Sequence, residues 1–128
     1  MNLRTLIVIA LMLVFVGCST APTNPIGSLP AVEENIPWQP TDLVAEVEAP
    51  DSTTARLKWI DNSLIEKTYE VWIASNSGVF VPCKILPSNT EFCIIDGLNK
   101  QHLYIFAVHA VNNQYFSQPA IDSVNTKY

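Results

Sequence analysis

The chain has 128 residues, of which 48% are hydrophobic and 15% are charged, and its formal net charge is −5. The seven Lys and Arg residues are spread singly along it, which argues against a nucleic-acid partner and against electrostatic attraction to an anionic membrane. This length leaves room for one ordinary domain plus additional segments.

The first 17 residues have the pattern of a targeting segment, so they are excluded from the fold. Residues 6–16 form an apolar run that is shorter than the roughly 20 residues of a spanning helix. Gly17, Cys18 and Ser19 follow this run, and the arrangement resembles the lipobox of bacterial lipoproteins, although Phe15 stands where that family usually has Leu. The resemblance implies cleavage before Cys18 and anchoring in a lipid bilayer through acylated Cys18. The alternative is ordinary signal-peptide cleavage after Ala21.

Both alternatives place the mature protein outside the cytoplasm. In the lipoprotein family, Ser19 after the cysteine favours an outer-membrane anchor facing the periplasm. Residues 18–39 are rich in proline and lack an apolar period, which indicates a tether that holds the domain off a membrane. Such a tether reaches about 25 Å as a random coil, or about 65 Å if it is wholly polyproline II. Trp38 near its end is expected to lie over the end of the following domain, with a membrane-interface or partner role as the alternative.

Residues 40–124 are expected to form one all-β domain, because apolar and polar side chains alternate with a period of two and turn residues separate the runs. Pro82 in the fourth run indicates an edge strand, and no segment has a helical period. Short strands with this spacing predict an immunoglobulin-like Greek-key β-sandwich. The seven predicted strands cover residues 43–48, 55–60, 69–74, 79–85, 91–95, 104–111 and 115–124.

Several motifs of this domain resemble those of fibronectin type III domains. Trp59 is followed by Asp61-Asn62-Ser63 and Glu66, and the third strand contains Tyr69-Glu70-Val71. Leu98 precedes Tyr104 with the spacing of a tyrosine corner, in which the ring packs inward and the hydroxyl bonds to upstream backbone. The resemblance implies a fibronectin type III sandwich. The chain has no Arg-Gly-Asp, so integrin-type adhesion is not implied.

The same resemblance suggests a cysteine pairing. Cys83 and Cys93 remain as an even pair if Cys18 is acylated, and the compartment is oxidising. In a type III sandwich their two strands lie close together. A Cys83–Cys93 disulfide is therefore expected, and the alternative is two buried thiols that behave as small hydrophobic side chains.

Catalytic chemistry finds little support. His102 and His109 are expected on opposite strand faces, so they cannot share a metal ion, and two cysteines alone are too few for a metal site. Glu46 and Glu48 share a face that is expected to be solvated, unlike the facing carboxylates of an acid–base pair. No nucleophile or phosphate-binding motif is present. We therefore expect no enzymatic activity, no cofactor and no metal.

One feature does indicate binding. If Tyr69 and Tyr104 point into the core, strand alternation turns other side chains outward on neighbouring strands of one sheet. Large exposed apolar patches on a monomer usually have a use, and Trp is a favoured anchor. Partial cover by Glu70, by Lys side chains or by the tether is the alternative. The candidate partner-binding residues are Trp72, Ile105, His109 and Val111.

The sequence thus predicts a membrane-anchored, non-enzymatic module of the cell envelope that binds a protein partner or a second copy of itself. One alternative is a carbohydrate-binding module, in which Trp72 would stack on a sugar ring. Another is a structural envelope spacer without a specific ligand, for which the tether would matter more than any face.

Overall fold

The computed structural model describes residues 35–48, 53–76 and 78–127. Within these ranges, no helix is long and apolar enough to cross a membrane. The predicted signal peptide (1–17), Cys18 and the tether up to residue 34 lie outside the described residues. The described strands are β1 (Thr41–Val47), β2 (Ala55–Ile60), β3 (Thr68–Ser75), β4 (Val81–Pro87), β5 (Phe92–Ile95), β6 (Leu103–Asn112), β7 (Tyr115–Phe116) and β8 (Ala120–Asn125).

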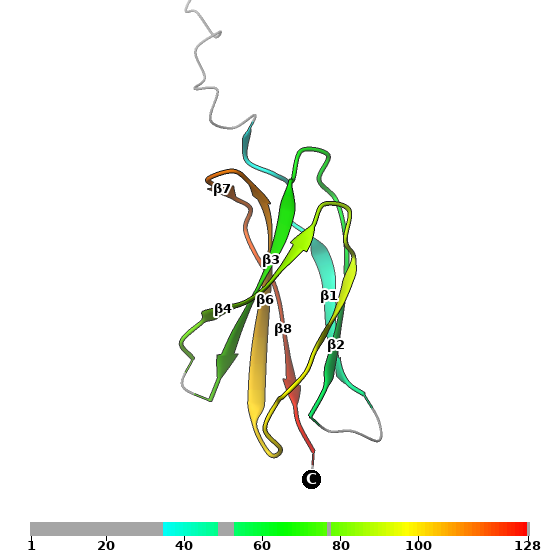
Figure 1. Cartoon of the computed structure of the whole chain (residues 1–128), viewed down its shortest axis with the longest axis vertical. Coiled ribbons are helices and arrows are strands. Elements are labelled where there is room, and N and C mark those ends of the chain that lie inside the picture. The colour runs from blue at the N-terminus through cyan, green and yellow to red at the C-terminus, as the bar shows by residue number, and fades with distance from the viewer. Residues whose placement is uncertain (1–34, 49–52, 77, 128) are drawn as a thin grey trace, which may run out of the picture. The chain divides into compact units, whose positions relative to one another are not determined.

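The strands form two antiparallel sheets that pack face to face (Figure 1). One sheet has the order β1-β2-β5, and the other has the order β4-β3-β6-β7 with β8 also paired to β6. After β4 the chain leaves the larger sheet and returns beside β2 as β5, which is a Greek-key connection. The predicted all-β sandwich is therefore confirmed.

The last predicted strand, 115–124, is divided into β7 and β8. At Ser117 the strand pairing changes: its amide still donates to the Ala110 carbonyl, but its Oγ replaces a strand carbonyl as the acceptor for the Ala110 amide. Pro119 follows, and it has no amide hydrogen to donate to a neighbouring strand. The expected edge strand around Pro82 is found as β4, which ends the strand order of its sheet.

The inward faces of the two sheets supply the core. Trp59 from β2 and Tyr69 from β3 meet at its centre with ring centroids 5.6 Å apart. Burying such aromatic side chains contributes much of the stability of a small domain. The other members of the core cluster are Leu43, Ala45, Ala55, Leu57, Val71, Cys93, Ile95, Leu98, Tyr104, Phe106, Val108, Ala110 and Ala120.

The predicted tyrosine corner is present. Tyr104 and Leu98 are buried, and the Asn99 amide donates a hydrogen bond of 2.9 Å to the Tyr104 hydroxyl. This bond fixes the loop that crosses from β5 to β6.

The first and last strands lie at opposite ends of the sandwich. Because Thr41 pairs with Ile60 whereas Asn125 pairs with Leu103, β1 begins at one end and β8 ends at the other.

Candidate interaction face

The register of the larger sheet brings apolar side chains from several strands onto its outer face. Trp72 on β3 is opposite Ala107 on β6, which in turn is opposite Ile121 on β8. One row further along, Ile85 on β4 is opposite Glu70, and Glu70 is opposite His109. We call this surface the Trp72 face, and its members are Trp72, Ile85, Ile105, His109, Phe116 and Ile121.

Three aromatic rings run across the Trp72 face. The ring centroids of Trp72 and His109 are 6.4 Å apart, and those of His109 and Phe116 are 5.9 Å apart, both in edge-to-face geometry. The Nδ1 atom of His109 lies 2.9 Å from the Ser117 carbonyl oxygen. Since a carbonyl only accepts, His109 carries a proton on Nδ1, which fixes the ring orientation and leaves Nε2 as the other polar atom.

The rim of the Trp72 face is more exposed than its centre. Ile85 is 69% exposed and Ile121 is 58% exposed, whereas Trp72, Ile105 and His109 are half-buried. Strand alternation in the sequence predicts these three central residues but not Ile85, Phe116 and Ile121. Their alternation in the fourth and last strands was visible, but only the strand register shows that they share a face with Trp72.

Val111, which the sequence predicts as a binding residue, does not belong to this accessible surface. It has the predicted orientation, but it is only 4% exposed. It lies near the end of β6 between Thr68 on β3 and Phe116 on β7. The chain before β1 also passes this end, where the Asn112 side chain donates to the Asn35 carbonyl.

The structure also shows how much of the Trp72 face is covered by polar groups. Glu70 accepts a hydrogen bond of 3.1 Å from the indole Nε1 of Trp72. Lys84 does not lie over the face, because its Nζ donates to the Ile94 carbonyl of the other sheet. Partial cover by Glu70 is therefore present, while the apolar rim stays open.

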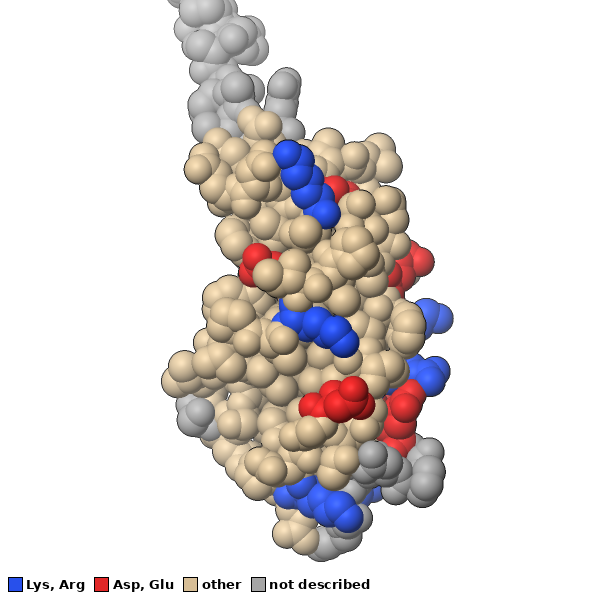
Figure 2. All heavy atoms as spheres, viewed as in Figure 1, with Lys and Arg blue, Asp and Glu red and all other residues tan. Residues whose placement is uncertain are grey.

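Charge distinguishes the two outer faces of the sandwich. Among the described residues whose side chains point outward from the larger sheet, Glu70 is the sole charged one. The outer face of the smaller sheet also exposes apolar residues, but cations lie among them: Val44 and Phe92 flank Lys58, and Arg56 lies over the Phe92 ring. Figure 2 shows that uncharged residues make up most of the surface in this view.

Both cysteines of the domain are free, so the structure does not contain the predicted Cys83–Cys93 disulfide. Cys93 points into the core from β5, whereas Cys83 is exposed on β4 in the other sheet. The register shift opposite Val71 and Trp72 leaves Cys83 without a Cα partner on β3. Burial raises the pKa of the Cys93 thiol to about 11, and burial also raises the pKa of Cys83.

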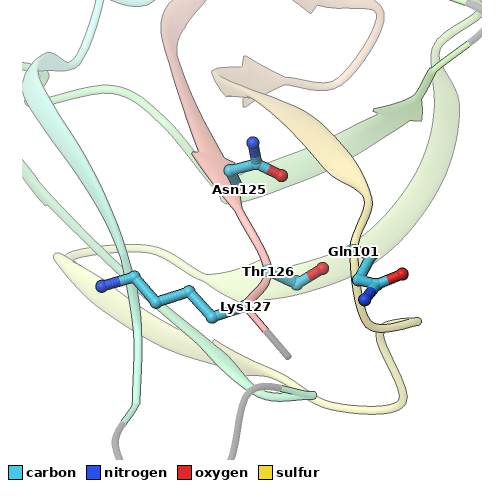
Figure 3. A pocket seen from close by; sticks show the side chains of 4 residues that line it. All are labelled: Gln101, Asn125, Thr126 and Lys127. Carbon is cyan, nitrogen blue, oxygen red and sulfur yellow. The ribbon is translucent and has the colours of Figure 1, made fainter.

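Other polar sites have structural roles. A hollow of about 440 Å³ near the end of β8 is lined by Gln101, Asn125, Thr126 and Lys127 (Figure 3). The Thr126 hydroxyl there is used by the fold, because it bonds to the Asn99 carbonyl and to the His102 amide. His102 lies before β6 with its Nδ1 at the Lys100 carbonyl. No group of three metal-ligating side chains occurs among the described residues.

The fold of the domain matches known structures, although its sequence matches no known family. No known family profile matches the sequence, and no curated protein matches it. Solved structures do match. A structure described as FN3tt mut has a TM-score of 0.63 and 22% sequence identity, with 73% of this chain and 99% of that chain covered.

Two further structures show the same fold. The third fibronectin III domain of human KIAA0343 protein has a TM-score of 0.59 and 18% identity, with 73% of this chain and 86% of that chain covered. The FN1–FN3 domains of chicken CNTN1 have a TM-score of 0.64 and 14% identity, with 72% of this chain and 31% of that chain covered. The described domain therefore has the fibronectin type III fold. Domains of this fold are commonly protein-interaction modules and are generally not enzymes.

Proposed function

We propose that this protein is a lipid-anchored, non-enzymatic binding module of a bacterial cell envelope, which docks a protein partner on the Trp72 face. The anchor is supported by the lipobox-like sequence at Cys18. The docking function is supported above all by one observation, the apolar surface that spans β4, β3, β6, β7 and β8 with Glu70 as its sole described charge.

The composition of the face fits a protein interface. Trp and other aromatic side chains are enriched at the centres of interfaces, where they are surrounded by contacts that exclude water. Trp72, His109 and Phe116 hold each other edge to face, so little side-chain entropy is lost when a partner covers them. Ile85 and Ile121 would supply the apolar rim on either side.

The experiment begins with a photocrosslinking amino acid at Ile121 in the full-length protein in its own envelope. The same amino acid at Lys58, on the outer face of the other sheet, is the control. A partner crosslinked from position 121 but not from position 58 is then purified. Its affinity is measured for the wild-type protein, for Trp72→Ala and for Phe92→Ala, after thermal unfolding has shown that both variants fold.

Trp72→Ala is expected to weaken the complex by at least about 1 kcal/mol, which is roughly a fivefold rise in Kd. Phe92→Ala truncates an aromatic side chain on the other outer face and should leave the Kd unchanged. Equal affinities for both variants would remove the Trp72 face from the interface. Binding to a glycan array that is lost in Trp72→Ala would instead assign the face to carbohydrate.

A further inference from the structure

The two most exposed large apolar side chains of the described residues lie at one end of the sandwich. Leu64, in the loop between β2 and β3, is 98% exposed, and Trp38, just before β1, is 73% exposed. A single exposed apolar side chain is ordinary on a protein surface. Both are carried to this end of the sandwich by segments that are distant in sequence.

Hydrogen bonds join the two segments. The Asn62 side chain donates to the Gln39 carbonyl at 3.0 Å and to the Thr41 hydroxyl at 3.1 Å. The residue after Trp38 is therefore in direct contact with the residue two positions before Leu64. We call this end of the sandwich, formed by residues 35–41 and 61–67, the Trp38 pole. Two further apolar residues of the pole, Ile36 near Trp38 and Ile65 beside Leu64, are each 39% exposed.

The outward direction of both side chains is imposed by their neighbours. Pro37 and Pro40 are buried on either side of Trp38, and Ser63 and Glu66 are buried around Leu64. The loop itself is held by the Asp61 carboxylate, which accepts from the Ser63 amide, and by the Ser63 hydroxyl, which accepts from the Ile65 amide. Trp38 and Leu64 are thus presented on a supported surface.

The carboxylates of this loop are engaged with the protein. Asp61 accepts from the Tyr69 hydroxyl, and the buried Glu66 accepts from the Asn89 amide. Lys67 is the exposed charge of the loop, and Glu91 lies nearby, where it accepts from the Asp61 amide. With Asp42 beside Thr41 also counted, the Trp38 pole exposes one cation and two carboxylates, a small net negative charge that physiological salt screens beyond about 8 Å.

The chain upstream of the Trp38 pole determines what lies near it. Cys18 is 17 residues before Asn35, and a segment of that length spans about 23 Å as a random coil or about 53 Å as polyproline II. With Cys18 acylated, the bilayer surface is therefore within reach of this pole. We propose that the Trp38 pole rests on that bilayer, with Trp38 and Leu64 inserted at the lipid–water interface, where Trp side chains are enriched in membrane proteins. This inference rests on the proposed lipid anchor.

The test uses the full-length lipidated protein, purified from membranes and reconstituted into phosphatidylcholine–phosphatidylglycerol vesicles with brominated acyl chains. Flotation of the vesicles first shows whether the protein is anchored. Brominated lipid quenches tryptophan fluorescence at close range, and the chain has three Trp residues, of which Trp59 is in the core. Trp38→Phe and Trp72→Phe are compared with the wild type.

The wild-type protein is expected to float and to be quenched, Trp72→Phe to retain the quenching, and Trp38→Phe to lose most of it. Leu64→Ser should weaken the quenching with Trp38 still present, because one of the two inserted side chains is gone. Flotation without quenching, or equal quenching in both Trp variants, would overturn the resting pole and leave the anchor intact. Failure to float would overturn the anchor itself and this inference with it.

Discussion

At the scale of single residues, the tyrosine corner shows what the sequence can predict. Leu98 and Tyr104 are close in the chain, so the bond from the Asn99 amide to the Tyr104 hydroxyl depends on a local spacing. Tyr69 makes contacts over a longer distance in the chain, with two residues of the motif that begins at Trp59. Tyr69 packs on Trp59, and its hydroxyl donates to Asp61 at 2.5 Å. Burial, the hydrogen bond to Asp61 and the nearby carboxylates all raise the pKa of Tyr69.

We expect Tyr69→Phe to lower the free energy of unfolding by about 1.5–3 kcal/mol, the range for a hydrogen bond to a charged group. The substitution keeps the ring in the core and removes only the hydroxyl. Urea denaturation measures the change, and Tyr115→Phe at a half-buried position is the control. A loss no larger than in the control would mean that the Tyr69–Asp61 bond does not contribute to stability.

The two thiols should differ in reactivity. In the reduced, folded protein, Cys83 is expected to react with iodoacetamide well before Cys93, because Cys83 is exposed and Cys93 is buried with a pKa of about 11. An unfolded cysteine ionises near pH 8.5. Folding therefore favours the protonated Cys93, and its contribution to stability is lost as the pH rises from about 8.5 toward 11. Peptide mass spectrometry of timed labelling measures both rates, and similar rates would contradict the described burial.

At the scale of elements, β4 shows the limit of sequence reasoning. Its edge position was predictable from Pro82, because proline cannot supply an amide to a second neighbour. The bulge at Cys83 and the pairing of Ile85 with Glu70 could not be predicted, because they depend on the register between β4 and β3. For the same reason the centre of the Trp72 face could be predicted from alternation within strands, whereas its rim and the burial of Val111 could not. Ser117 divided β7 from β8 through a side-chain bond that no periodicity reveals.

β4 also leaves one edge of its sheet open, with Val81 about half exposed. Exposed apolar edge strands promote association, and lysine on such an edge prevents it. We expect Val81→Lys to change the free energy of unfolding by no more than about 0.5 kcal/mol and to reduce self-association at high concentration. Light scattering and thermal unfolding measure the two effects, with Ile60→Lys, at a similarly exposed position on the central strand β2 of the other sheet, as the control. Association that falls equally in both variants would point to net charge instead of the edge.

At the scale of the whole molecule, the Trp38 pole and the Trp72 face lie on different parts of the sandwich, one at an end and one on a side. A module that rests on its end keeps its side free for a partner beside it. The intact mass of protein purified from membranes checks the anchor directly. We expect the mass of Cys18–Tyr128 plus acyl chains, and Cys18→Ala should abolish both the acylation and membrane retention. An unacylated chain that begins near Pro22 would mean a secreted domain.

The opposite positions of the first and last strands have a mechanical consequence. β1 begins at one end of the sandwich and β8 ends at the other (Figure 1). A pulling force applied between the two ends of the domain therefore runs along the strands, and the ladders between β1 and β2 and between β6 and β8 carry it in shear. Many hydrogen bonds then share the load at once, together with the bond from the Ala45 amide to Asp122 that joins β1 to β8. A domain loaded in this way resists extension along its strands.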